Sequence, residues 1–225
     1  GLLFVILVLA ESALELVPRE IWSHPAVVAD ARRRGKKPGE ILLDRSRHHP
    51  AMAGLLDSRR RGRPDIVHQA LLVFQYSLLA ARGLGRMYIH TLGDYVISVD
   101  PSTRVPKNYN NFVSLVEQLF AAGRVPSEGR PLMEIRRQGL RDLLTELGGR
   151  WVVMHEAGSR IPLVQLGKEV LDSVVVIGGF PHGDFNNKWV LEEAAARFSL
   201  GEVAMDAAQV ACRVVAAAEA AAGLL

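Results

Sequence analysis

The sequence is poor in cysteine and has no long apolar run. Cys212, the single cysteine among 225 residues, lies in an alanine-rich stretch and is expected to pack in the core. Disulfide frameworks and cysteine-based zinc clusters are therefore excluded, and a reducing compartment, the cytoplasm, is favoured. The apolar run at residues 2–9 is much shorter than the roughly 20 residues that a membrane-spanning helix needs. We therefore expect a buried strand there and no membrane partner.

The sequence also lacks the glycine-rich loops that bind phosphates and the residue spacings that are typical of metal sites. The sequence has no GxGxxG fingerprint and no P-loop, which argues against a dinucleotide-dependent oxidoreductase. Asp44, His48 and His49 lie close together, but their spacing matches no zinc pattern. We expect no metal, and these histidines are interpreted as helix-capping, hydrogen-bonding or phosphate-contacting groups.

The composition is that of an ordered globular protein. Hydrophobic residues make up 49% of the chain, which is ample for a packed core. No Ser/Gly-rich linker marks a boundary, so residues 1–225 are predicted to form a single domain. A hairpin pattern, MYIHT and YVISVD around LGD, predicts a small inserted lobe or extension at about residues 86–108.

Strand and helix patterns alternate along the chain. Predicted strands cover residues 2–9, 41–44, 87–91, 95–100, 151–155, 174–179 and 198–200. Predicted helices cover residues 11–17, 21–34, 66–81, 109–121, 134–147, 164–171, 188–197 and 204–222, with Asp65 as a candidate N-cap. This alternation indicates an α/β fold with a mostly parallel sheet flanked by helices.

Positive charge is concentrated in one part of the sequence. Residues 32–107 contain 15 Lys or Arg against 6 Asp or Glu, a balance of +9, which leaves −6 for the rest of the chain. Such a distribution is typical of a protein that binds a polyanion, and RNA is the predicted partner. A merely solvated basic surface is the alternative.

Two polar clusters lie within this basic region. The first, residues 44–52, follows a predicted strand end, where sites collect in open α/β sheets. The second contains Arg63, Pro64 and Asp65, in which the carboxylate can hold the guanidinium ready for a phosphate or a base edge. An ordinary ion pair at a helix start explains this second cluster equally well.

Three predicted strand ends in the last third carry a further cluster. IGGFPHGDF, residues 177–185, follows a buried strand, and its glycines permit a close backbone approach to a ligand. Residues 153–156 and 198–202 are expected at the same edge of the sheet. Apolar loops with exposed backbone groups suit the adenine and methionine parts of a nucleoside cofactor better than a triphosphate.

Taken together, these motifs resemble a known family. LLDRSRHHPAM, RRGRPDIVHQALL, HTLGDYVISVDPSTRVPKNYNNFVSLVEQLF, VVVIGGFPHGDF and SLGEVAMDAAQVAC occur here in the order typical of the pseudouridine-N1 methyltransferases of small-subunit ribosomal RNA, in the SPOUT superfamily. The resemblance covers nearly the whole chain, and the compact length is more similar to archaeal members.

The resemblance implies more than the residue patterns do. It implies a SPOUT-type sheet with a C-terminal trefoil knot, a homodimer, and a methyltransferase that takes S-adenosylmethionine as cofactor and small-subunit ribosomal RNA as substrate. It also implies a role in small-subunit ribosome biogenesis.

The family's site residues fall on definite positions of this sequence. For RNA, the resemblance implies contacts by Arg63, Arg104, Lys107 and Asn111, with Asp65 orienting Arg63. For the cofactor, the implied residues are Met154, His155, Gly178, Gly183, Leu200, Gly201, Val203, Ala204 and Met205.

The proton acceptor and the exact activity stay open at this stage. Asp44 and Asp65 are the candidate bases, although an aspartate bound to arginine is a poor base and water is the alternative. The rival functions are a non-catalytic ribosomal-RNA-binding assembly factor and a SPOUT methyltransferase with another RNA target.

Overall fold

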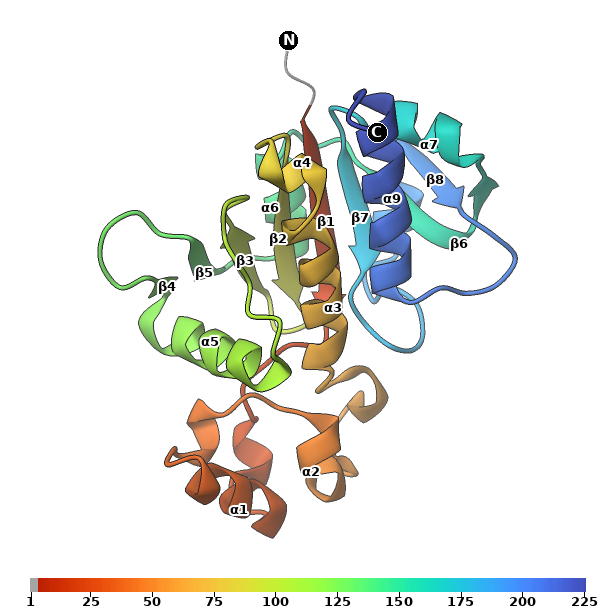
Figure 1. The fold of residues 1–225 in the computed structure, drawn as a ribbon. Helices are drawn as coiled ribbons and strands as arrows, with labels where there is room; N and C mark the ends of the chain where they lie inside the picture. Colours follow the sequence, from red (N-terminus) through yellow and green to blue (C-terminus); the bar gives the residue numbers. More distant parts are fainter. Residues whose placement is uncertain (1–3) are drawn as a thin grey trace.

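The chain folds around one eight-stranded sheet with helices on both faces, as a computed structural model of residues 4–225 shows (Figure 1). The strands are β1 (Val5–Ser12), β2 (Gly85–Thr91), β3 (Tyr95–Val99), β4 (Arg124–Val125), β5 (Met133–Arg137), β6 (Val152–Arg160), β7 (Val174–Gly178) and β8 (Ala196–Ser199). The α-helices are α1 (Pro25–Arg33), α2 (Arg45–Met52), α3 (Pro64–Gln75), α4 (Leu78–Ala81), α5 (Tyr109–Ala122), α6 (Leu140–Glu146), α7 (Leu163–Val170), α8 (Trp189–Glu192) and α9 (Ala207–Ala221).

The sheet is mostly parallel, as predicted. Its strand order is β4-β5-β3-β2-β1-β7-β6-β8, and the five strands from β2 to β8 run parallel to one another. The predicted hairpin is present as β2 and β3, and antiparallel β3, β5 and β4 extend the sheet beyond it. Because β2 pairs with β1, the lobe expected at about 86–108 is an extension of the main sheet.

The central strand β1 is buried on both faces. Leu7 and Leu9 pack into one core with α3, α5 and α9, whereas Val8 and Ala10 pack into the other with α6 and α8. A parallel strand covered by helices on both sides requires such a continuous apolar sequence. The strand predicted at residues 2–9 is therefore confirmed from Val5 onward, while residues 2 and 3 lie outside the described residues.

Residues 13–62, here the α1–α2 segment, project from the carboxyl end of β1 (Figure 1). The segment has a small core of its own, to which Val27 of α1 and Met52 of α2 contribute. The helix predicted at 21–34 is confirmed for Pro25–Arg33, which is α1, and a separate short 3-10 turn, Arg19–Ile21, precedes it.

Two predictions for this segment are wrong. Residues 11–17 do not form a helix, because β1 continues to Ser12 and Leu16 makes an isolated β-bridge with Leu42. Residues 41–44 contribute only that bridge instead of a strand. The side chain of Asp44 caps α2 by accepting a hydrogen bond from the Ser46 amide at 2.9 Å, so the polar residues after it are helical.

Further corrections concern helix ends. Arg63, and not Asp65, occupies the N-cap position of α3, and the long helix expected at 66–81 breaks at Tyr76, after which Ser77 caps α4. The first part of the helix expected at 134–147 is strand β5, because it pairs with β3. Likewise, Ala196 and Arg197 belong to β8, which pairs with β6 and limits α8 to four residues.

Helix α9 confirms the predicted C-terminal helix and closes the structure. Its small residues pack inward: Ala211, Val214 and Ala218 are buried, and α9 lies against α7 and α3. Cys212, expected in the core, is exposed on the outer face. The threading of this region as a trefoil knot stays a prediction.

The contact between α7 and α9 generates a stability prediction. At Gly167 of α7 a Cβ atom would stand 2.4 Å from the carbonyl oxygen of Ala217. Gly167→Ala is therefore expected to lower the free energy of unfolding by about 1–3 kcal/mol, despite the higher helix propensity of alanine. Guanidinium denaturation measures this, with Gly54→Ala as control because a Cβ there meets nothing within 4 Å. Equal stability of the two variants would refute the close packing.

Candidate functional site

A cavity of about 630 Å³ opens at the carboxyl ends of β7 and β8. This is the edge of a parallel sheet at which α/β proteins bind ligands, and the volume is that of a small-molecule site. Its wall comes from the end of β6, the loop after β7, the loop after β8, and the first turns of α3 and α9.

The structure brings all the predicted cofactor residues together in this cavity. The nine of them that line it are Met154, His155, Gly178, Gly183, Leu200, Gly201, Val203, Ala204 and Met205. Arg63 and Asp65, predicted for RNA, line the same cavity. Whether these residues bind the predicted ligands stays a prediction.

The two loops that line the cavity offer free backbone groups. Within residues 4–225, no backbone–backbone hydrogen bond involves the peptide groups of 180–183 or 200–205. Apart from the Gly201 carbonyl, which accepts from the Ser199 hydroxyl at 3.1 Å, these donors and acceptors are therefore available to a ligand, because backbone groups require a hydrogen-bond partner when they are covered. The apolar side chains of Ile177, Leu200 and Val210 form the other part of the wall.

An irregularity in β6 shapes one side of the cavity. Both Met154 and Ser159 pair with Phe198 of β8, so residues 155–158 bulge out of the strand. Gly158 permits this, because a Cβ there would come 2.6 Å from the Arg197 carbonyl carbon. The bulge turns His155 toward the loop after β7, where its Nε2 lies 3.0 Å from Asp184 Oδ1.

Arg63 and Asp65 form a bidentate ion pair at the mouth of the cavity. Arg63 Nε and Nη2 donate to the two carboxylate oxygens of Asp65, both at 2.9 Å. Pro64, the first residue of α3, stiffens the backbone between them. The pair fixes the plane of the guanidinium while leaving it about one third exposed, at 35% for the side chain. The predicted orientation of Arg63 by Asp65 is thus present in the structure.

Helix α3 also holds the loop that carries the other predicted RNA residues. Gln75 Nε2 donates to the carbonyls of Asp100 and Thr103, and Tyr76 Oη donates to that of Val105 at 2.9 Å. His68 Nε2 lies 2.7 Å from the Pro106 carbonyl oxygen.

Arg104, Lys107 and Asn111 are exposed on this loop and at the start of α5, outside the cavity wall. The Lys107 ammonium lies 4.8 Å from the centre of the Tyr76 ring.

Asp44 lies outside the cavity lining and has other partners. One oxygen accepts from the amide and hydroxyl of Ser46, and the other accepts from the Tyr109 hydroxyl at 2.5 Å. Burial and this contact with Asp44 raise the pKa of Tyr109 far above its ordinary value, so the phenol stays protonated. The two carboxylate oxygens of Asp65 are engaged by Arg63. A role for either aspartate as general base stays a prediction.

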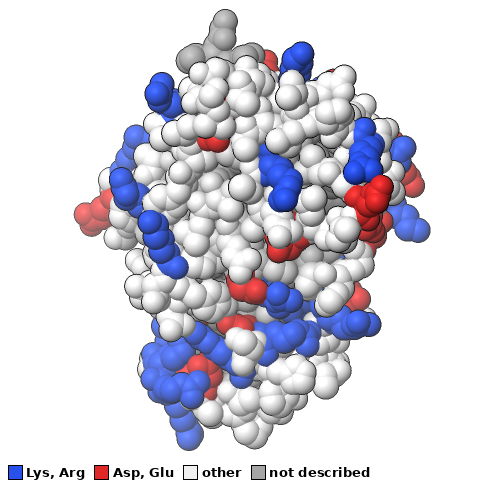
Figure 2. Space-filling model, turned by 45° about the vertical axis from the view of Figure 1, so that its right-hand side comes forward, with Lys and Arg blue, Asp and Glu red and all other residues white. Residues whose placement is uncertain are grey.

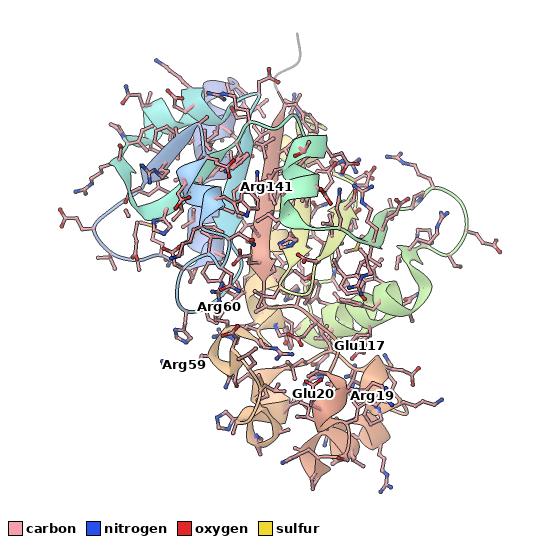
Figure 3. All side chains as sticks on the ribbon, turned by 180° about the vertical axis from the view of Figure 1, so that it is seen from behind. Arg19, Glu20, Arg59, Arg60, Glu117 and Arg141 are labelled. Atoms are coloured by element: carbon pink, nitrogen blue, oxygen red, sulfur yellow. The ribbon has the colours of Figure 1, made fainter. Side chains whose placement is uncertain are left out.

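Sequence reasoning missed two residues behind the cavity, Glu11 and Arg60. Arg60 Nη1 donates to the Asp184 carbonyl and to Asn186 Oδ1, each at 2.6 Å, and its guanidinium lies 4.2 Å from the Phe180 ring centre. Its Nη2 donates to Glu11 at 3.1 Å. Figure 3 shows Arg60 where the α1–α2 segment meets the loop after β7.

Glu11 is a buried carboxylate at the end of β1. It accepts from the amides of Asn186 and Asn187 at 2.7 and 3.0 Å, besides Arg60. The two residues therefore hold the loop 179–187, which lines the cavity, against the sheet. The signal in the sequence was the acidic residue at a buried strand end together with the arginine run.

Positive charge gathers on the part of the surface formed by the α1–α2 segment, at the bottom of Figure 2. Several arginines of the run have carboxylate partners, since Arg60 binds Glu11 and Arg61 binds Glu15 at 2.6 Å. The free positive charge is therefore smaller than the sequence count suggested, although Arg59 is exposed.

The described part of the chain shows neither a metal centre nor a membrane span. No group of three or more His, Cys, Asp or Glu side chains in it is placed to hold a metal ion. None of its helices has the length and apolar character needed to cross a bilayer.

Fold and site together define a class of protein. A mostly parallel α/β sheet carries a nucleoside-sized cavity at its carboxyl edge, beside a surface rich in arginine and lysine. The model of the EMG1/NEP1 methyltransferase family matches residues 7–219. The chain belongs to this family, which confirms the resemblance found in the sequence.

Similar proteins cover nearly the whole chain. The ribosomal RNA small subunit methyltransferase Nep1 of Pyrobaculum arsenaticum is 97% identical over 221 residues, which are 98% of this chain and 100% of that protein. Nep1 of Staphylothermus marinus is 46% identical over 86% of each chain. The crystal structure of Archaeoglobus fulgidus Nep1 bound to S-adenosylhomocysteine is 42% identical, with a TM-score of 0.87 and coverage of 98% of this chain and 99% of that one.

Proposed function

We propose that this protein transfers a methyl group from S-adenosylmethionine to ring nitrogen 1 of a pseudouridine in small-subunit ribosomal RNA. The coarser statement follows from the family: the chain is a small-subunit ribosomal RNA methyltransferase that uses S-adenosylmethionine. The observation that carries the cofactor is the full-length similarity to a Nep1 that holds S-adenosylhomocysteine. The choice of pseudouridine N1, and a role in small-subunit biogenesis, are our proposals.

The cavity fits the proposed cofactor. Its volume of about 630 Å³ lies in the range of small-molecule sites. The free peptide groups of the loop 200–205 suit the edge of an adenine, and Leu200 and Val210 suit its faces. Met154, His155, Gly178 and Gly183 then surround the rest of the molecule. When bound, the cofactor supplies a methyl group activated by a sulfonium.

The residues of the chain would contribute mainly by positioning the base. Arg63, held by Asp65 at the mouth of the cavity, is placed to bind a phosphate or base edge next to the nucleotide that enters. A base reaches such a cavity only if it is turned out of its stack. Orientation of the two reactants supplies much of the rate enhancement of such a transfer. Arg104, Lys107 and Asn111 would bind the flanking RNA.

Ring nitrogen 1 must lose a proton in this reaction. Both oxygens of Asp65 accept hydrogen bonds from Arg63, and Asp44 is buried beneath Tyr109. An acceptor whose lone pairs are engaged in this way is a poor base, so we propose that water at the open cavity takes the proton.

The first prediction from the proposed function tests the activity itself. Only pseudouridine has a free N–H at ring position 1, because in uridine this nitrogen bears the ribose. We expect methyl transfer to hairpins that tile the small-subunit ribosomal RNA of Pyrobaculum arsenaticum when one carries pseudouridine, and no transfer to its uridine twin. Mass spectrometry of the nucleosides measures this. Equal methylation of both hairpins would point to a position that the two nucleosides share, a ribose oxygen or ring nitrogen 3, and no transfer to any hairpin would favour a non-catalytic assembly factor.

The second prediction separates two arginines that lie three residues apart. Arg60→Ala removes the support of the loop 179–187 and is expected to weaken S-adenosylhomocysteine binding at least about tenfold. Arg63→Ala removes an exposed guanidinium and is expected to weaken RNA binding about tenfold, with cofactor affinity unchanged.

Calorimetric titration with S-adenosylhomocysteine and fluorescence titration with RNA make the comparison on variants whose folding is checked by circular dichroism. The variants serve as controls for each other. Parallel losses of both ligands in both variants would contradict the separation of these roles.

We also propose a homodimer, formed through the outer face of α3. Between Asp65 and Arg82 the chain has no Asp, Glu, Lys or Arg. Val73 of α3 is partly exposed, and Tyr76, directly after α3, is exposed. Ile66 and Gln69 of the same helix line the cavity, so a partner on this face would stand beside the site. The small residues of α9 pack against α7 and α3 within the chain and are therefore not available for a dimer interface. The outer face of α3 is the better candidate for that interface.

The third prediction concerns this dimer. Sedimentation velocity is expected to give the mass of two chains for the native protein and of one chain for Val73→Asp, because a buried carboxylate at an apolar interface is costly. Leu56→Asp is the control, since Leu56 is exposed in the α1–α2 segment, away from α3. A dimer that survives Val73→Asp would exclude this face.

The knot and the cellular location of the protein are also proposals. We propose that the chain from β7 to α9 forms the trefoil knot: β8 lies at the edge of the sheet, whereas α9 returns to pack on α3 near its centre. We also propose that the protein works in the cytoplasm, because the ribosomal RNA of an archaeal cell is located there.

A further inference from the structure

A second polar pocket lies between α1, α2 and α5. It has a volume of about 310 Å³ and is lined by Asp30, Arg33, Arg34, Arg47, Asn110 and Ser114. None of these residues lines the cavity at the carboxyl edge of the sheet. Helix α2 lies within the basic part of the sequence, residues 32–107, whereas α1 ends at its start and α5 follows its end. The pocket has no role in the methyl transfer described above.

The only carboxylate of this pocket is already neutralised. Asp30 Oδ1 accepts from Arg33 Nη2, and Oδ2 lies against His48 Nε2, both at 2.8 Å. Burial raises the pKa of Asp30, but these two hydrogen bonds, together with the charges of His48 and Arg34, leave the pKa below its ordinary value. Asp30 is therefore ionised and anchors Arg33, and it offers little acceptor capacity to a ligand.

The other groups of the pocket are donors. Arg47 Nη2 donates to Asn110 Oδ1, so the amide nitrogen of Asn110 remains as a donor. The Arg33 side chain is 69% exposed and uses one nitrogen for Asp30. Ser114 Oγ and Asn110 Nδ2 have no hydrogen-bond partner among residues 4–225. A pocket that presents arginine and amide donors around an engaged carboxylate selects an anion.

Arg34 forms the rigid back of the pocket. It donates to Glu117 of α5, to which Lys36 also donates at 2.7 Å. The second oxygen of Glu117 accepts from the Leu42 amide at 2.8 Å, and Figure 3 shows Glu117 where α5 meets the α1–α2 segment. The Nη1 of Arg34 is buried without a hydrogen-bond partner in the described chain, but it lies 4.0 Å from Asp30 Oδ2, so Arg34 pairs with both Asp30 and Glu117. The lining as a whole is still positive, because three arginines stand against one carboxylate.

The pocket is connected to the predicted RNA contacts. Arg47 Nε lies 3.8 Å from Asp44, which accepts the hydroxyl of Tyr109. Tyr109 follows the loop that carries Arg104 and Lys107. The hydrogen bond with Asp65 and the charge of Asp65 raise the pKa of the Arg63 guanidinium, and the charge of Asp44 contributes in the same direction. A chain bound across Arg63 and this loop would continue over Arg47.

We propose that the pocket between α1, α2 and α5 binds one backbone phosphate of the substrate RNA, flanking the nucleotide that enters the cavity. Arg33 and Arg47 contact the phosphate oxygens, Asn110 and Ser114 donate the remaining hydrogen bonds, and Arg34 supplies charge from behind. The inference depends on the proposed function for the identity of the anion, because an RNA strand is the polyanion that the family acts on. It assigns no sequence preference to the pocket, since phosphate contacts fix register only.

The test compares Arg33→Ala and Arg47→Ala with Arg32→Ala. Arg32 is the matched control because it lies on α1, is exposed, does not line the pocket and loses the same charge. Arg34 is left unchanged because its removal would take one of the charged donors away from the buried carboxylate of Glu117. RNA affinity is measured from low to high salt with the tightest-binding ribosomal RNA hairpin of the tiled set, carrying uridine so that no methyl transfer is needed.

Each pocket variant is expected to bind RNA about tenfold more weakly at low salt. The slope of log affinity against log salt should fall by about one counterion. Binding of S-adenosylhomocysteine should not change. Pocket variants that match Arg32→Ala in slope and affinity would overturn the proposal, while leaving the methyltransferase activity intact.

A second measurement locates the phosphate. In a series of hairpins with one uncharged methylphosphonate linkage each, one linkage is expected to weaken binding by the native protein and by Arg32→Ala, but not by Arg47→Ala. Such non-additivity shows that the linkage and Arg47 belong to one contact. Additive losses at every linkage would overturn the pocket as a defined phosphate site. If the native protein bound no hairpin, the proposed function would fail together with this inference.

Discussion

The carboxylate of Glu11 is the contact on which the site depends. Glu11 lies at the end of the central strand. Its backbone adopts the left-handed conformation, with φ at 51°, which is costly for a residue with a side chain. The conformation is held by the contact of its amide with His90 Nδ1 and by donors from Arg60, Asn186 and Asn187 to its carboxylate. Burial lowers the pKa of His90, so the ring is neutral and accepts from the Glu11 amide. One buried charge thus joins the sheet, the α1–α2 segment and the loop after β7, and its burial is tolerable because every oxygen is bonded.

The parallel core could be predicted because its physics is local. Runs such as Val174–Gly178 are apolar on both faces and rich in β-branched residues, which is typical of a strand between two helical layers. Errors arose where pairing or capping with distant residues decided the conformation. Residues 11–17 have helical spacing, but Glu11 and Glu15 are taken up by Arg60 and Arg61. Similarly, Met133–Arg137 is a strand because β3 offers a free edge, which no local pattern reveals.

The cavity residues were predictable for a related reason. Parallel strands place their carboxyl ends at one edge, so loops after β7 and β8 must meet wherever both strands are identified. The role of Arg60 could not be predicted, because the arginines of residues 59–63 look alike in the sequence. Only the fold gives each of them a different partner. Arg60 faces inward to Glu11, Arg63 faces the cavity mouth, and Arg59 faces solvent. Net charge therefore indicated the polyanion but overstated how much of the run is free to bind it.

This distribution gives the segment 59–65 a second consequence. Arg60 holds the loop that lines the proposed cofactor cavity, whereas Arg63, three residues later, stands where RNA is expected to enter. The Arg63 amide donates to the Ala13 carbonyl at 3.0 Å, so the segment is also fixed to the chain just beyond Glu11. If RNA displaced this segment, the groups that hold the cofactor loop would move as well, and the reverse would hold for the cofactor. Because coupling between two binding equilibria is reciprocal, any tightening of cofactor binding by RNA through this segment implies an equal tightening of RNA binding by cofactor. Under the proposed function, the cofactor and the RNA therefore depend on the same short piece of backbone, residues 59–65, which is anchored through Arg60 and through the Arg63 amide.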